Sequence, residues 1–186
     1  ISSVRAVVIS HDHWDHTGGL WEILSSREGL KVYGCPGFSA GFKSKVGALK
    51  GEFIELDKVT EIAKGIYATG EIPGDYKGQY MPEQALVVKG EHGISVIPGC
   101  AHPGVVKILG KVRETFSTED IYLVLGGFHL MGKDKRMINI IVDEFRNLGV
   151  KKAGPCHCSG DEAERIFRDK YKDNFVKVKA GGEIEI

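Results

Sequence analysis

The residues best suited to chemistry lie at positions 11–16, which read His-Asp-His-Trp-Asp-His. Imidazole and carboxylate groups are the usual protein ligands of zinc and related cations. Four side chains here could bind metal: His11, His13, Asp15 and His16. They follow directly on the apolar run Val4 to Ile9, so we expect them where a buried strand ends and a loop begins. The segment predicts a metal site at a strand tip, in preference to a polar loop that contains histidines by chance.

The spacing of these ligands suggests two cations. If residues 4–10 form a strand, His11 and His13 are two apart and can project to the same side. Asp15 and His16 follow a turn later and should point elsewhere. That arrangement suits a second cation close to the first, as in hydrolases that use two metals.

The motif resembles the H-x-H-x-D-H signature of the metallo-β-lactamase superfamily. Members add one histidine from a later strand end and another near the C-terminus, and Cys100-Ala101-His102 and Cys156-His157-Cys158 stand in those places, each after an apolar run. The resemblance spans nearly the whole chain. It implies that the metal ligands are His11, His13, Asp15, His16, His102 and His157.

The same resemblance implies an α/β fold, a four-layer αββα sandwich that forms one domain over residues 1–186. Because members usually carry several dozen residues before the motif, we expect the N-terminal strands of this fold to be missing from the chain. Four shorter segments resemble the subgroup labelled metal-dependent hydrolases, superfamily II, which includes an archaeal enzyme that joins a dihydropterin to a ribosyl-aminobenzene phosphate. These segments are Thr69 to Pro73, Glu83 to Leu86, Gly99 to Gly104 and Gly126 to Leu130.

One position departs from the superfamily pattern. Most members supply a bridging aspartate at a strand end before the last histidine, but here the strand Ile121 to Leu125 runs into Gly126 and Gly127. His129 is the nearest side chain of a ligand type, and we expect it to face the metals or to contact substrate as a catalytic group; the alternative is a histidine bonded into a loop. Loss of one negative charge should weaken the second site, held by Asp15, His16 and His157.

The four cysteines predict a reducing compartment, by default the cytoplasm, better than a disulfide framework. In a strand, alternation would send Cys156 and Cys158 to the face opposite His157. We therefore expect both to be small buried apolar side chains. This interpretation is favoured over a zinc finger, because the adjacent ligands of Cys156-His157-Cys158 cannot all turn to one ion and no second C-x-x-C pair exists to complete a structural site. Cys100 should likewise be a small buried side chain, although its closeness to His102 leaves open that it helps to position this ligand.

The composition limits the kinds of partner that the chain is expected to bind. With 186 residues and 42% apolar content the chain can bury one sizeable core. Lys and Arg balance Asp and Glu at 25 each. The composition therefore gives no excess of positive charge that would indicate nucleic acid as a partner. No apolar stretch is long enough to span a membrane, and no signal peptide is recognised. The expected partner is a small molecule that could carry a phosphate, and the oligomeric state is not indicated.

Apolar periodicity predicts alternating strands and helices after the motif. Helices are expected over 17–26, 103–116, 137–148 and 162–171, and strands over 31–33, 53–56, 65–68, 84–89, 93–98, 121–125, 150–153 and 175–179. Residues 38–50 show weak periodicity, and residues 70–82 should form an irregular polar loop near the pocket. His92 should lie in an exposed turn.

The leading functional hypothesis is a metal-dependent hydrolase that attacks a small molecule with a metal-bound hydroxide. Its cofactor would be one or two divalent cations, with zinc first and iron, manganese or magnesium as alternatives. Asp15 would orient the attacking group, and His129 would donate to the developing charge. Two alternatives remain: a metal-dependent transferase that condenses a pterin diphosphate with an aromatic amine, and a non-catalytic metal-binding module.

Overall fold

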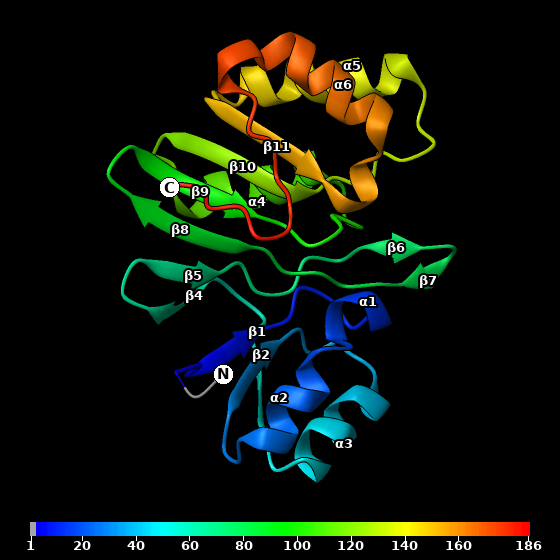
Figure 1. Ribbon diagram of the computed structural model, residues 1–186, viewed down its shortest axis with the longest axis vertical. Helices are drawn as coiled ribbons and strands as arrows, with labels where there is room; N and C mark the ends of the chain where they lie inside the picture. The colour runs from blue at the N-terminus through cyan, green and yellow to red at the C-terminus, as the bar shows by residue number, and fades with distance from the viewer. Residues whose placement is uncertain (1–2) are drawn as a thin grey trace.

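The computed structural model describes residues 3–186 and arranges them in four layers (Figure 1). The smaller sheet is parallel, with strand order β1-β2-β3: β1 (Ala6–Val8), β2 (Lys31–Gly34) and β3 (Glu52–Glu55). Parallel neighbours need crossover connections, which α2 (Leu20–Ser26) and α3 (Ala40–Ala48) provide. These helices bury Leu20, Leu24, Phe42 and Val46 against Val32 of the sheet.

The larger sheet has six strands in the order β11-β10-β9-β8-β5-β4. Their bounds are β4 (Thr60–Ala63), β5 (Ile66–Ala68), β8 (Leu86–Gly90), β9 (Gly93–Ile97), β10 (Ile121–Gly127) and β11 (Lys152–Cys156). Strands β4, β5, β8 and β9 pair antiparallel, whereas β9, β10 and β11 pair parallel. The second half of the sheet therefore has the strand–helix–strand pattern that positions ligands at carboxyl ends.

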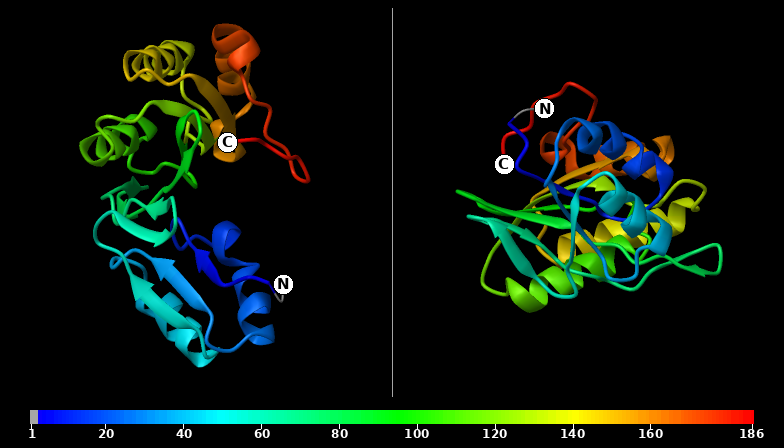
Figure 2. Two further views of the ribbon diagram at one scale, coloured as in Figure 1. Left: turned by 90° about the vertical axis from the view of Figure 1, so that its left-hand side faces the viewer. Right: turned by 90° about the horizontal axis from the view of Figure 1, so that it is seen from below.

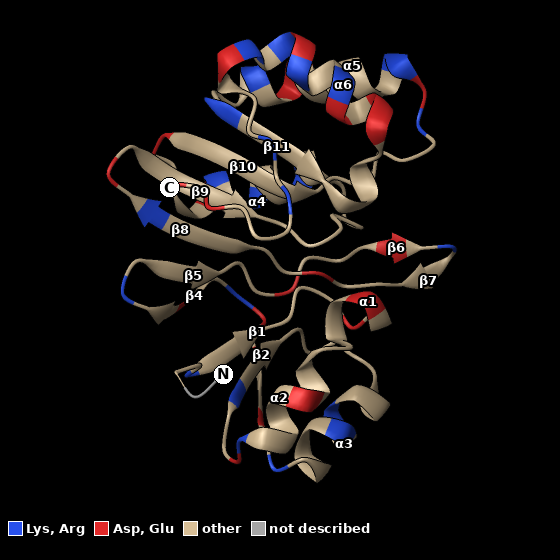
Figure 3. Ribbon diagram, in the orientation of Figure 1, with Lys and Arg blue, Asp and Glu red and all other residues tan. Residues whose placement is uncertain are grey.

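Three helices cover the larger sheet: α4 (Val105–Thr115), α5 (Lys135–Asn147) and α6 (Asp161–Tyr171). The core between these layers includes a cluster of Phe128, Phe145 and Phe167, whose ring centroids lie 5.2 to 5.5 Å apart. Charged residues of both signs lie along the outer helices, while the central strands carry few (Figure 3). With α2 and α3 on the far side, the layers run helices, sheet, sheet, helices, the predicted αββα sandwich (Figures 1 and 2).

Most predicted elements are present, with shifted ends. The helix expected over 17–26 is divided into α1 (Trp14–Thr17) and α2, with Gly18 and Gly19 between them. His92 is exposed in the turn between β8 and β9, as predicted. Within residues 3–186, no helix has the length and apolar character needed to cross a membrane.

Three expectations about elements need correction. The expected strand at 175–179 was wrong: one bridge joins Phe175 to Ala153, after which the chain packs across Gly154 instead of continuing the ladder. Residues 38–50 contain α3, which begins after Ser39, whose side chain accepts the Phe42 N–H. The loop at 70–82 contains a hairpin, β6 (Asp75–Tyr76) and β7 (Gln79–Tyr80), and the short 3-10 helices η1 (His157–Ser159) and η2 (Lys172–Asn174) were not anticipated.

We predict that Phe145→Ala lowers the free energy of unfolding by about 3–5 kcal/mol, because its fully buried ring leaves a cavity in the aromatic cluster. Ile140→Ala, an exposed position on the same helix, is the matched control and should change it by about 0.5 kcal/mol or less. Urea denaturation measures both. Equal losses in the two variants would contradict the assignment of the core.

Candidate metal centre

The predicted ligands meet at one edge of the larger sheet. Residues 11–16 follow β1, His102 follows β9, His129 follows β10 and His157 follows β11. Because β9, β10 and β11 are parallel, their carboxyl ends share this edge, and the end of β1 is brought against it by the smaller sheet (Figure 1). Four segments distant in sequence therefore supply one site.

The first group consists of His11, His13 and His102, whose ligand atoms all lie within 4.8 Å of one another. Their ring centroids are 4.6 to 5.0 Å apart. His11 is fully buried, and its Nε2 has no hydrogen-bond partner among the described residues. A buried nitrogen without a partner is costly, and a cation shared with the other two imidazoles would satisfy it. The donor set therefore fits a divalent metal.

The protonation of these histidines favours the same use. Burial lowers the pKa of His11 from 6.5 to about 3, and the nearby Glu83 carboxylate offsets only part of that effect. Burial likewise lowers the pKa of His13 and of His16. Since only neutral imidazole binds a metal, these side chains are ready ligands at neutral pH.

The second group consists of Asp15, His16 and His157, which also lie within 4.8 Å of one another. The Asp15 carboxylate is 3.6 Å from His16 Nε2 and 3.4 Å from His157 Nε2. Although burial alone would raise the pKa of Asp15, its backbone amide and the two histidines lower it overall. The structure thus brings the six predicted ligand residues together as two adjacent groups.

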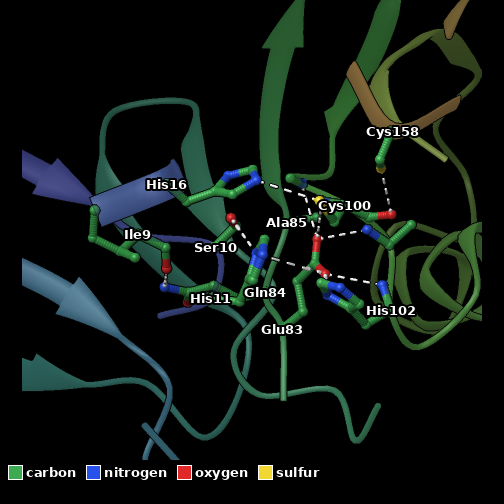
Figure 4. A network of polar contacts seen from close by, with 12 residues as sticks. Ile9, Ser10, His11, His16, Glu83, Gln84, Ala85, Cys100, His102 and Cys158 are labelled. Carbon is green, nitrogen blue, oxygen red and sulfur yellow. Dashed lines mark hydrogen bonds and ion pairs between the residues drawn. The ribbon is translucent and has the colours of Figure 1, made fainter. Parts of the chain in front are cut away.

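A residue that sequence reasoning missed supports the first group. Glu83 is fully buried, and its Oε1 accepts the backbone N–H groups of Gly99, Cys100 and Ala101 at 2.8 to 2.9 Å (Figure 4). Its Oε2 accepts the His102 N–H at 3.0 Å and lies 3.1 Å from His102 Nδ1. That contact assigns the proton to Nδ1 and leaves the His102 Nε2 lone pair for a metal.

These hydrogen bonds keep the Glu83 carboxyl group ionised. Burial would raise the pKa of this carboxyl, but the hydrogen bond to His102, the proximity of His11 and the backbone amides together lower it to about 2. A signal was available in the sequence: an acidic residue at the entry of a buried strand needs polar partners. What the sequence does not show is which segment provides them.

Gln84 fixes the other half of the site. Its side-chain Nε2 donates to the carbonyls of Ile9 and Tyr33 at 2.8 and 3.2 Å, and its backbone N–H donates to the Ser10 carbonyl at 2.9 Å (Figure 4). These bonds tie the end of β1 to the start of β8. Adjacent residues thus hold the His11 segment and the His102 segment in place.

His129 lies beside the first group. Its ring centroid is 4.8 Å from that of His102 and 5.9 Å from that of Tyr76. Burial, and then the nearby His102, lower its pKa. Within the described residues it belongs to none of the candidate ligand groups, and its buried Nδ1 has no partner there.

The expectation that Cys156 and Cys158 are buried was wrong, because both are half-buried. Strand β11 ends at Cys156, and His157 adopts a left-handed backbone with φ of 53° as η1 begins. The alternation of a strand therefore no longer applies, and Cys158 is half-buried and lines the cleft. Cys100 is buried, as predicted, but its Sγ lies 3.3 Å from His16 Nε2. Cys156 is half-buried and joins no candidate ligand group of the described chain.

Both groups open into a cleft of about 530 Å³, a size typical of small-molecule sites. Trp14 and Met131 stand at its rim, with 83% and 67% of their surfaces exposed. Tyr76, from the β6–β7 hairpin, lines it next to His13, with ring centroids 4.9 Å apart. The cleft thus combines histidines at its base with large apolar side chains at its entrance.

Comparison with known proteins gives consistent results. The family described as the metallo-beta-lactamase superfamily matches residues 1–110. The 7,8-dihydropterin-6-methyl-4-(beta-D-ribofuranosyl)-aminobenzene-5'-phosphate synthase of Methanocaldococcus jannaschii is 28% identical, over 96% of this chain and 74% of its own. An uncharacterized protein of the same organism is 26% identical, over 97% of this chain and 78% of its own.

Two solved structures have the same fold. The crystal structure of Tm1679, a metal-dependent hydrolase of the beta-lactamase superfamily, matches with a TM-score of 0.80 and 31% identity, over 98% of this chain and 79% of that one. An isothiocyanate hydrolase from Delia radicum gut bacteria matches with a TM-score of 0.65 over 99% of this chain and 77% of that one. At 13% identity the second match speaks for the fold alone.

We predict that Glu83→Gln weakens zinc binding by about 10- to 100-fold, because an amide cannot accept all the bonds that orient His102. Isothermal titration calorimetry of the metal-free protein measures the affinity. Glu71→Gln is the matched control, since Glu71 also accepts one backbone N–H, from Gly37, but does not line the cleft. Unchanged zinc affinity in Glu83→Gln would contradict the orienting role.

We predict that His11 accounts for part of the loss of stability of the metal-free protein at acidic pH. Its pKa of about 3 in the folded state lies below its ordinary value of 6.5, so the unfolded chain binds the extra proton between these values. The free energy of unfolding should therefore fall as the pH falls through this window.

His11→Gln removes up to about one proton from the difference in proton binding between the unfolded and folded states. The slope of the free energy of unfolding against pH should therefore decrease by up to about 1.4 kcal/mol per pH unit. Denaturation of the metal-free protein at several pH values between 6.5 and 4 measures it. His92→Gln removes an exposed imidazole outside the site and serves as control. Parallel curves for wild type and His11→Gln would show that His11 titrates normally.

Proposed function

Because the chain belongs to the metallo-β-lactamase superfamily, we propose that it is a metal-dependent hydrolase acting on a small molecule. The observation that carries this proposal is the convergence of His11, His13 and His102 on one point beside the cleft, with the buried His11 Nε2 lacking any partner in the described chain. His11, His13 and His102 would hold one cation, and Asp15, His16 and His157 a second. Zinc suits ligands rich in imidazole.

A divalent cation in this position supplies Lewis-acid polarisation of the scissile group and lowers the pKa of water. The chain's own residues provide positioning and proton transfer. Asp15 is a carboxylate at neutral pH, since its pKa is lowered, and about a third of its side chain faces solvent. It can therefore accept a proton from, and orient, an attacking group at the base of the cleft.

His129 supplies the complementary group. Burial keeps its imidazole neutral at neutral pH, so it retains one N–H donor. From its place beside His102, that N–H can donate to the negative charge that develops on a substrate oxygen or leaving group. The two roles that hydrolysis requires thus fall to Asp15, beside His16 and His157, and to His129, beside His102.

The rim of the cleft favours a substrate with a flat apolar part. Trp14, Met131 and Tyr76 offer two aromatic faces and a flexible thioether at the entrance. The similarity to the pterin-linked synthase and this aromatic rim favour a second candidate, a transferase in which an aromatic amine displaces a diphosphate from a pterin derivative. In that reaction the amine nitrogen forms a bond to the pterin-bearing carbon as the carbon–oxygen bond to the diphosphate breaks. The amine proton passes to Asp15 or to solvent.

The test is turnover by zinc-loaded protein of known metal content. Phosphodiester, lactone and thioester substrates report hydrolysis, and a pterin diphosphate with an aromatic amine reports transfer. Hydrolysis that depends on zinc supports the proposal, whereas condensation without hydrolysis assigns the transferase. Tightly bound zinc with no turnover of any substrate would overturn both and identify a non-catalytic metal-binding module.

We predict that His129→Gln lowers kcat by about 10²- to 10⁴-fold, because its N–H no longer meets the developing charge. The zinc content should stay unchanged, since His129 is in neither ligand group. Steady-state kinetics and elemental analysis on the same preparations measure both quantities. His92→Gln, outside the cleft, should retain full activity, and loss of zinc in His129→Gln would instead make His129 a ligand.

A further inference from the structure

Two thiols lie within reach of the second ligand group. The ligand atoms of Cys100, His157 and Cys158 are all within 4.8 Å of one another. The Sγ of Cys100 lies 3.3 Å from His16 Nε2 and also shares a candidate group with His11 and His16. Cys100 thus lies next to members of both histidine groups, and Figure 4 shows it beside His16.

The space that a carboxylate from β10 would use is already filled. A Cβ on Gly127 would lie 2.3 Å from the Gly99 carbonyl oxygen and 2.7 Å from Cys158 Sγ. No side chain fits there without displacing the backbone or this sulfur. Strand β10 therefore cannot contribute an acidic ligand at this position, and one of the atoms closest to that Cβ, the Cys158 sulfur, is itself a potential ligand.

The charges point the same way. Asp15 is the one acidic side chain in the two ligand groups of the described residues, and two adjacent dications need further negative charge. Glu83 does not provide a ligand, because its oxygens already accept four backbone N–H groups. Thiolates would supply both the missing charge and the missing ligand atoms.

We propose that Cys100 and Cys158 are ligands of the second cation through their sulfur atoms, together with His157. On binding, each S–H bond breaks, its proton passes to solvent and a sulfur–metal bond forms. Soft sulfur ligands select zinc or ferrous iron over magnesium. This inference rests on the proposed function, whose second cation it supplies with ligands.

X-ray absorption at the zinc edge tests the proposal on the full chain saturated with zinc. Wild type should show sulfur scatterers at about 2.3 Å in addition to nitrogen and oxygen. Cys156→Ser is the matched control, because Cys156 flanks His157 on its other side and joins no ligand group of the described chain; its spectrum should be unchanged. The double variant Cys100→Ser/Cys158→Ser should lose the sulfur signal and bind about one zinc fewer per chain.

Only nitrogen and oxygen around zinc in the wild-type protein would overturn the proposal, and this result needs no variant to fold. Sulfur scattering that survives in the double variant would overturn it as well. The two proposals fail separately: turnover with a spectrum free of sulfur refutes the thiolate ligands alone. Sulfur coordination without turnover of any substrate refutes the proposed enzymatic function, whereas the proposal that Cys100 and Cys158 are metal ligands stands.

Discussion

The buried carboxylate of Glu83 is the constraint on which the site depends. A charge removed from water is tolerated only when its oxygens are fully bonded, and Glu83 meets this condition through four backbone N–H groups and the His102 ring. Those donors come from consecutive residues, 99–102, which wrap around the carboxylate. Ala101 is held there with φ of 60°, a conformation that costs about 1–3 kcal/mol in a residue other than glycine. The bonds to Glu83 offset that cost and direct His102 toward His11 and His13.

Sheet topology makes this contact possible. Strands β8 and β9 pair antiparallel, with Leu86 opposite Ile97, so the residues that precede β8 necessarily lie beside those that follow β9. Strands β9, β10 and β11 pair parallel, so His102, His129 and His157 reach the same edge. β9 is the strand at which antiparallel pairing changes to parallel, and it therefore brings the Glu83 support and the ligand-bearing ends together.

Particular residues show how far the sequence could predict this site. The grouping of His11 and His13 with His102, and of Asp15 and His16 with His157, followed from strand-tip placement and from the family resemblance, and the structure brings these residues together. Glu83 was quoted only as part of a motif, because its role depends on a pairing across 16 to 19 residues that periodicity does not report. Cys158 was misplaced because one left-handed residue, His157, ended the strand alternation on which that prediction relied. Helix α3 was not predicted since glycine and lysine weaken its apolar pattern, although Ser39 provides its N-cap.

The two ligand groups differ in how firmly the chain holds them. His11 and His102 are almost fully buried and bonded through Glu83 or packed beside it, so the first group is preorganised. Asp15 and His157 have side chains 33% and 43% exposed, and they stand on the four-residue α1 and the three-residue η1. Short elements that bury few apolar side chains are the parts of a fold that open most easily. An exposed and weakly anchored second group needs additional ligands to retain a cation, and the buried sulfur of Cys100, next to members of both groups, lies where such a ligand would stabilise it most.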